Sequence, residues 1–245
     1  MAGHSKWANI KHRKSAQDAR RAKVFTKVAR EITVAAREGG GDPEANPRLR
    51  AAIAAARQVN MPNDKIDRAI KKGTGELQGE SYEEVVYEGY GPGGVAILIQ
   101  AMTDNRNRTT SEIRHVFNKY GGELGSPGSV AWMFERKGYI EVAREGVDED
   151  ALMEVVLEAG GEDLRGEGDH FEIYTDPSAF HGVRDAVEAA GFEIRTAELA
   201  MVPQNTVPVA ADRAEGLLRL LEMLDDQDDV QKVFANCQIE GEPGA

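Results

Sequence analysis

Lysine and arginine side chains, which can neutralise phosphate groups, gather at one end of this 245-residue chain. Residues 1–75 hold 17 of the 30 basic residues but only 7 of the 42 acidic ones, so this segment carries a formal charge of +10 and the remainder −22. Proteins bind nucleic acids largely by neutralising phosphates and releasing counterions. The charge distribution therefore predicts a polyanionic partner that contacts the basic segment, because the acidic remainder would repel it. A solvated basic face without any partner is the alternative.

Fifteen residues are expected to contact nucleic acid. They are His4, Lys6, Trp7, Lys11, Arg13 and Lys14 near the N-terminus, Arg20, Lys23, Lys27, Arg30, Lys65, Arg68 and Lys72 on helices, and Arg106 and Arg108 in a later turn. Trp7 could stack on an unpaired base while neighbouring cations follow the phosphates, as in proteins that bind single-stranded or irregular nucleic acid. It could equally pack beneath the first helix as an apolar anchor.

Arg106 and Arg108 form the expected second contact point, between a predicted strand and a predicted helix. Neither has an obvious partner nearby in the sequence, so both could hold phosphates at the helix N-terminus, with Asp104 and Asn107 as turn and capping groups. The alternative is that both arginines pair with the acidic part of the chain.

The sequence gives no sign of catalysis or metal binding. Its five histidines show no metal-ligand spacing, and the single cysteine, Cys237, is expected to be a buried thiol in a reducing cytoplasm. The acidic pairs at 225–226 and 228–229 fit a solvated turn better than a metal site. The glycine-rich run 89–94 lacks the Gly-Lys-Ser/Thr ending of a phosphate-binding loop. We therefore expect neither an enzyme nor a cofactor, metal or small-molecule substrate.

Three helices should position the basic residues of the head. At helical spacing over residues 15–37, Phe25, Val28 and Ile32 share one face, and the opposite face carries the predicted basic stripe. The glycines at 39–41 should end this helix. Asn46 before Pro47 predicts the start of a second helix, and a third should run from about residue 63 to 73.

The remainder of the chain predicts two α/β units. Residues 82–88 and 95–102 resemble hairpin strands, followed by a helix from about 109 and a strand over 130–134. From 139 to 200 the expected order is strand, helix, two short strands, helix and strand, which is ferredoxin-like. A strand at 207–209, a helix at 211–224 and a strand at 230–239 should complete the first unit.

The predicted fold class is α+β, with three domains: a basic three-helix head and two ferredoxin-like units, one inserted in the other. The expected limits are 1–80 for the head, 81–134 with 204–240 for the middle domain, and 135–203 for the inserted domain, joined through hinges at 135–137 and 203–208. The longest apolar run, 95–99, is too short to span a bilayer, and no apolar block of a secretory signal follows the basic N-terminus. A cytoplasmic location is expected.

Several long motifs lie at residues 3–14, 25–32, 60–66, 87–94, 103–109 and 128–134. They resemble motifs of the YebC family, whose mitochondrial members include the translational activator of cytochrome c oxidase subunit I. The resemblance extends from residue 3 to about 240. The resemblance implies a non-enzymatic protein. Bacterial members are described as DNA-binding transcriptional regulators, whereas mitochondrial and some bacterial members are ribosome-associated translation factors.

Two functions of this class remain. The head shows no helix-turn-helix with a polar recognition face, and its basic stripe suits phosphates better than base edges, which favours an RNA-binding translation factor that contacts ribosomal RNA. A DNA-binding transcriptional regulator is the alternative, and a protein-only adaptor is a third class. The ribosome is a further expected partner, while a membrane is not. The sequence leaves the oligomeric state and the target sequence open.

Overall fold

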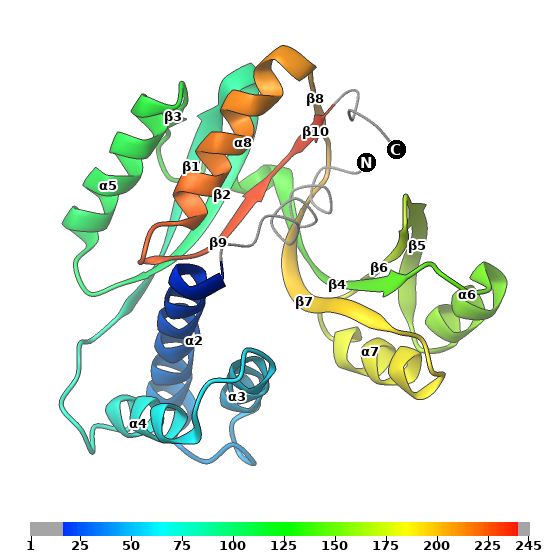
Figure 1. The fold of residues 1–245 in the computed structure, drawn as a ribbon, viewed down its shortest axis with the longest axis horizontal. Helices are drawn as coiled ribbons and strands as arrows, with labels where there is room; N and C mark the ends of the chain where they lie inside the picture. The colour runs from blue at the N-terminus through cyan, green and yellow to red at the C-terminus, as the bar shows by residue number, and fades with distance from the viewer. Residues whose placement is uncertain (1–16, 240–245) are drawn as a thin grey trace.

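The structure, a computed structural model, describes residues 17–239, with side chains from residue 22 onward. It has the predicted α+β architecture: a head of three helices and two antiparallel α/β units (Figure 1). The head consists of α2 (Gln17–Gly39), α3 (Pro47–Gln58) and α4 (Asn63–Gly73). No helix within residues 17–239 is both long and apolar enough to cross a membrane.

Asn46 fixes the geometry of the head. Its side-chain oxygen accepts a hydrogen bond from the backbone N–H of Leu49 at 3.0 Å, which caps α3, and its amide donates to the carbonyls of Ala35 and Gly40 at 2.8 and 2.9 Å. The buried Asn46 side chain thus ties the end of α2 to the start of α3. The predicted apolar faces pack against one another around Ile32 and Leu49.

The middle unit is assembled from two stretches of the chain. The first contains β1 (Glu83–Gly91), the short helix η1 (Pro92–Gly94), β2 (Val95–Thr103), α5 (Arg106–Lys119) and β3 (Glu123–Leu124), and the second contains β8 (Val207–Val209), α8 (Ala211–Asp225), β9 (Val230–Ala235) and β10 (Cys237–Ile239). The main sheet has the order β3-β1-β2-β9, and β8 pairs with β10. Helices α5 and α8 share one apolar core with this sheet.

The inserted unit has the predicted ferredoxin-like order. It consists of β4 (Phe134–Ala143), α6 (Glu149–Glu158), β5 (Gly161–Glu167), β6 (His170–Thr175), α7 (Phe180–Ala189) and β7 (Ile194–Pro203). Its sheet runs β5-β6-β4-β7, with every neighbouring pair antiparallel. The middle sheet is antiparallel too, but its order differs from the ferredoxin-like one, because β1 and β2 form a hairpin with no helix between them.

Two local predictions were wrong. The expected strand at 130–134 is instead the short helix η2 (Ala131–Met133), and β4 begins at Phe134. The expected hinge at 135–137 lies within β4, which pairs with β7 continuously from Phe134 opposite Pro203 to Glu141 opposite Thr196. A ladder of this length keeps the segment extended, so this part of the chain is not a hinge.

The two interfaces between the three parts differ in chemistry. Leu98 and Phe234 of the middle sheet pack against Tyr139, Tyr174 and Ala200 of the inserted sheet in one buried apolar cluster. The apolar cluster of the head, in contrast, contains only head residues among those that the structure describes. We propose the domain limits 1–80, 81–134 with 204–240, and 135–203, since apart from Phe134, the first residue of β4, each sheet or helical core lies within one of them.

Candidate nucleic-acid interface

Helix α2, which carries the predicted basic stripe, has one end next to the turn that joins α8 to β9, at residues 225–229 (Figure 1). Lys23 Nζ donates a hydrogen bond to the backbone carbonyl of Asp226 at 2.9 Å and lies 3.5 Å from its Oδ1. Lys27 Nζ donates to the carbonyl of Asp225 at 2.7 Å and to its Oδ1 at 3.3 Å. Because α8 ends here, the negative end of its dipole adds to the attraction of the carboxylates.

Arg30 continues the same row one turn further along α2. It pairs with Asp229 at 2.8 Å, donates to the backbone carbonyls of Asp228 and Met102, and lies over the ring of Tyr82. Lys23, Lys27 and Arg30 are therefore occupied by the chain's own acidic turn. The sequence could not show this contact, because the partners are about 200 positions apart.

Asp229 is the centre of this turn and is only 2% exposed. Its Oδ2 accepts hydrogen bonds from Arg108 at 2.7 Å and from Thr109 Oγ1 at 2.5 Å, while Oδ1 faces Arg30. Burial alone would raise the pKa of this carboxyl, but the bonds from Thr109 and Arg108 and the charge of Arg30 outweigh it, so the pKa is lowered. The prediction that this acidic pair lies in a solvated turn was wrong for Asp229.

Arg108 has partners that the sequence did not reveal. It bonds to Asp104 and to Asp229, both at 2.7 Å, so pairing with the acidic part of the chain is the alternative that the geometry favours for this arginine. Arg106 is exposed on the same turn and makes no ion pair with a described residue. Helix α5 begins at Arg106, earlier than expected, because Asn105 caps it by accepting from the backbone N–H of Arg108.

The remaining predicted cations of the head lie on α4. Lys65 and Arg68 are exposed and Lys72 is half-buried, and none forms an ion pair within residues 22–239, although Lys65 lies over the ring of Phe25. Lys71 is exposed beside them and was missed, although its position next to Lys72 was a visible signal. The face of α4 thus presents four cations to solvent.

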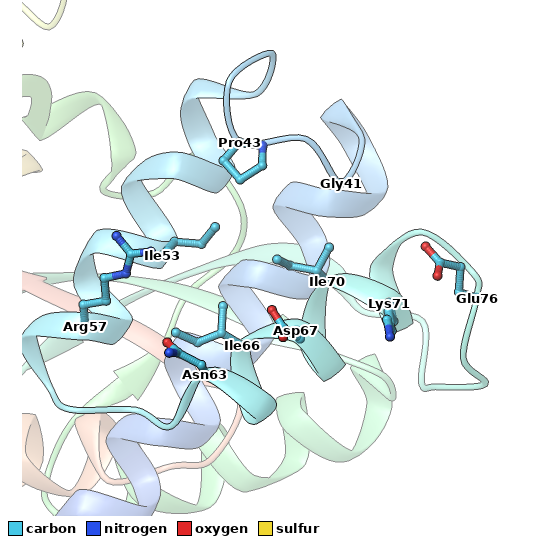
Figure 2. A pocket seen from close by; sticks show the side chains of 10 residues that line it. All are labelled: Gly41, Pro43, Ile53, Arg57, Asn63, Ile66, Asp67, Ile70, Lys71 and Glu76. Atoms are coloured by element: carbon cyan, nitrogen blue, oxygen red, sulfur yellow. The ribbon is translucent and has the colours of Figure 1, made fainter.

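A hollow of about 540 Å³ opens between α3, α4 and the loop after α2 (Figure 2). Ile53, Ile66 and Ile70 converge on it, and Arg57 and Lys71 lie at its rim. Arg57 is exposed and is a further cation that the sequence pattern did not single out. The lining also includes the carboxylates of Asp67 and Glu76, so the hollow adds no net positive charge, and it includes no nucleophile paired with a base.

The predicted contacts at the N-terminus lie outside the described residues: His4, Lys6, Trp7, Lys11, Arg13 and Lys14. The side chain of Arg20, in the first turn of α2, is also outside the described side chains. Their roles therefore stay predictions. Within residues 17–239 no group of His, Cys, Asp or Glu side chains could hold a metal ion.

A second feature, which the sequence analysis missed, is the buried Glu88. Its carboxylate accepts backbone N–H bonds from Gly128 at 2.6 Å and from Val130 and Ala131 at 2.7 Å. Burial would raise the pKa of this group, but the three bonds lower it overall. They fix the loop before β4 next to the β1–β2 hairpin and hold Trp132 in place, with 67% of its surface exposed.

Comparison with known proteins places these features in a family. Residues 5–76 match the model of the TACO1/YebC protein N-terminal domain, and residues 82–237 match that of the TACO1/YebC second and third domain. A probable transcriptional regulatory protein of Carboxydothermus hydrogenoformans is 61% identical over 242 residues, covering 98% of this chain and 99% of the relative. One from Geobacter sulfurreducens is 55% identical over 242 residues, covering 99% and 98%.

A crystal structure supports the same assignment. A conserved hypothetical protein from Aquifex aeolicus is 51% identical and superposes with a TM-score of 0.83, covering 94% of this chain and 95% of that one. Apart from residues 3 and 4, the motifs that resemble this family lie in the two matched regions. The chain therefore belongs to the TACO1/YebC family, a family of regulatory proteins and not of enzymes.

Proposed function

We propose that this protein regulates gene expression by binding nucleic acid through its basic head, as an RNA-binding translation factor associated with the ribosome. The observation that carries the proposal is the charge division: the head is strongly basic, and α4 presents Lys65, Arg68, Lys71 and Lys72 without ion-pair partners among the described residues. These cations suit phosphates, which give affinity without sequence readout.

DNA-binding transcriptional regulation is the second candidate, favoured by the names of the relatives. Sequence-specific readout normally needs a helix whose polar side chains reach base edges in the major groove. In the head, the basic face of α2 lies against the acidic turn, and α4 exposes Lys65, Arg68 and Lys71 together with the acidic Asp64 and Asp67. This arrangement supports contact with the phosphate backbone over sequence-specific recognition of duplex DNA.

Cosedimentation with ribosomal particles tests the proposal directly. At moderate salt the protein should pellet with the particles, and it should be released as salt rises, because phosphate contacts are weakened by counterions. A protein that stays in the supernatant while it binds duplex DNA in titrations would instead support the transcriptional candidate.

Removing cations from α4 should weaken binding to any nucleic acid. For the triple change of Arg68, Lys71 and Lys72 to alanine, we expect the slope of log K against log salt to become shallower by about 0.7 to 0.9 for each phosphate that the protein no longer neutralises. Fluorescence anisotropy of labelled RNA at several salt concentrations measures this slope. The matched control changes Arg114, Arg136 and Arg213 to alanine, which removes three exposed cations from the acidic domains. Equal effects in both variants would contradict a head-specific interface.

A substitution of Trp7 should distinguish RNA from DNA as the ligand. If it stacks on an unpaired base, Trp7→Ala should cost about 1–3 kcal/mol of binding to RNA with loops or bulges and much less with plain duplex DNA. The chain has two tryptophans, so a Trp132→Phe background makes Trp7 the sole tryptophan reporter of quenching. Equal losses on both ligands, without quenching by RNA, would assign Trp7 to packing.

A further inference from the structure

The contact between the head and the middle domain is held by charge. Among the described residues it includes the α2 cations on turn 225–229, with Arg30 also bonded to the Met102 carbonyl and lying over the ring of Tyr82. An ion pair between Arg48 and Glu84 and a hydrogen bond from Arg37 to Ser81 add to it. No apolar cluster among the described residues spans it, in contrast to the buried cluster that joins the middle and inserted domains. Interfaces without a large apolar area permit relative motion of domains. The head is therefore the part best suited to detach.

The chain also allows such a motion. The head continues into β1 through residues 74–82, of which 74–81 are exposed to solvent and none belongs to a helix or strand. Gly75 in this stretch has a φ of +83°, a conformation that favours glycine. The head and the middle domain could separate at this connection without disturbing the core of either.

The acidic turn presents to α2 the groups that a nucleic-acid backbone would present. Lys23, Lys27 and Arg30 lie about one helical turn apart on one face of α2, and each meets a backbone carbonyl and a carboxylate of the turn. A phosphate strand offers similarly spaced anionic oxygens. The three cations cannot satisfy both sets of oxygens at once, so the two partners must compete.

We propose that turn 225–229 acts as an internal phosphate mimic, a latch that holds the head against the middle domain. Nucleic acid displaces this turn from the cations of α2, and the head then moves away from the middle domain. This inference rests on the proposed function, since it concerns regulation of the same basic face. In the closed state the α4 cations remain available for a first contact. Release of the turn then adds Lys23, Lys27 and Arg30 to the interface.

A double substitution tests the latch. Asp225→Asn with Asp226→Asn keeps the side-chain size and the backbone carbonyls but removes the two charges that face Lys27 and Lys23. The buried Asp229 is left intact, so the middle domain should still fold. We expect labelled single-stranded RNA of mixed sequence to bind about threefold to tenfold tighter, because weakening the ion pairs raises the open fraction.

The matched control is Asp212→Asn with Glu215→Gln. Both residues are exposed near the start of the same helix, α8, and neither pairs with a described head residue, so the control changes the net charge equally. Comparison of the two variants separates release of the latch from the general effect of a less acidic protein.

Distance measurements on the full chain provide the second readout. Spin labels are placed on Ala45→Cys in the head and on Ala151→Cys on α6, both at exposed positions. They report the distance between the head and the inserted domain. Burial raises the pKa of the native Cys237 thiol to about 11, so it should label poorly. We expect RNA to lengthen the distance in the wild type, and the double substitution to lengthen it without RNA.

The outcomes distinguish the latch from the proposed function. Suppose that the wild type binds RNA. Equal affinities of the double variant and its control would then overturn the latch, and so would a distance that RNA leaves unchanged. In both cases the proposed function would still stand. If neither RNA nor duplex DNA binds the wild type, both proposals are overturned.

Discussion

Asp229→Ala should lower the free energy of unfolding by about 3 kcal/mol, the scale found when one partner of a buried ion pair is removed. The substitution leaves Arg30 without its carboxylate and removes the acceptor for Arg108 and Thr109. The destabilisation should therefore affect both the middle domain and its contact with the head. Urea denaturation monitored by circular dichroism measures it.

Lowering the pH should also remove the stability that Asp229 contributes. The folded-state pKa of Asp229 is lowered, so its contribution to stability is present above the ordinary aspartate pKa, near 3.9, and is lost as the pH falls through the folded value. The stability difference between wild type and Asp229→Ala should accordingly shrink as the pH falls below about 4. A pH-independent difference would mean that the variant acts through packing alone.

Neighbouring residues supply the controls for this prediction. Asp212→Ala removes an exposed carboxylate from α8 and should change the unfolding midpoint little. Arg108→Ala should destabilise the protein more than Arg106→Ala, because Arg108 contacts the buried Asp229 and Arg106 makes no ion pair with a described residue. Equal effects of the two arginine variants would contradict the network described above.

Local patterns were sufficient to predict most of the elements. Asn46 before Pro47 marked the start of α3, and the spacing of Phe25, Val28 and Ile32 gave the buried side of α2, because helix caps and helical faces depend on residues a few positions apart. The βαββαβ order of the inserted unit was likewise visible from alternating patterns. The three-helix head and the α+β class are confirmed.

Tertiary contacts decided what sequence patterns could not show. The basic side of α2 was correctly placed opposite the apolar face, but its contact with turn 225–229 depends on how the head docks on the middle domain. The sequence pattern likewise predicted two separate strands where β4 is continuous. Local preferences could not show that pairing with β7 keeps residues 135–137 extended. Charge at a surface does not show by itself whether a partner exists, or whether that partner lies in the same chain.

Whether the basic stripe on α2 is free or covered decides which ligands the protein can bind. A basic stripe that is free at all times would bind any polyanion it met, whereas a stripe covered by an acidic turn binds only ligands that outcompete the turn. The proposed latch thus adds selection for extended, densely charged ligands to an interface that otherwise recognises phosphate. The exposed cations of α4 would determine the first encounter, and the covered cations of α2 the final affinity.

Glu88→Gln should destabilise the protein by about 2–4 kcal/mol, because a side chain with 6% exposure would lose part of a set of three charge-assisted hydrogen bonds. A glutamine has a single acceptor oxygen. Its amide would place N–H groups against the backbone N–H of Gly128 or against those of Val130 and Ala131. The loop that carries Trp132 should then lose its fixed position.

Trp132 provides the local measurement for this variant. In a Trp7→Phe background it is the sole tryptophan, so its fluorescence anisotropy should fall in Glu88→Gln while Glu83→Gln, an exposed change in the same strand, leaves it unaltered. The pKa of Glu88 is lowered in the folded protein, so its contribution is present above the ordinary glutamate pKa and is lost as the pH falls through the folded value. Acid should therefore loosen the wild-type loop as well. If Glu88→Gln instead unfolded like Glu83→Gln and kept Trp132 rigid, the loop would be held by its glycine-rich turns and the carboxylate would contribute little.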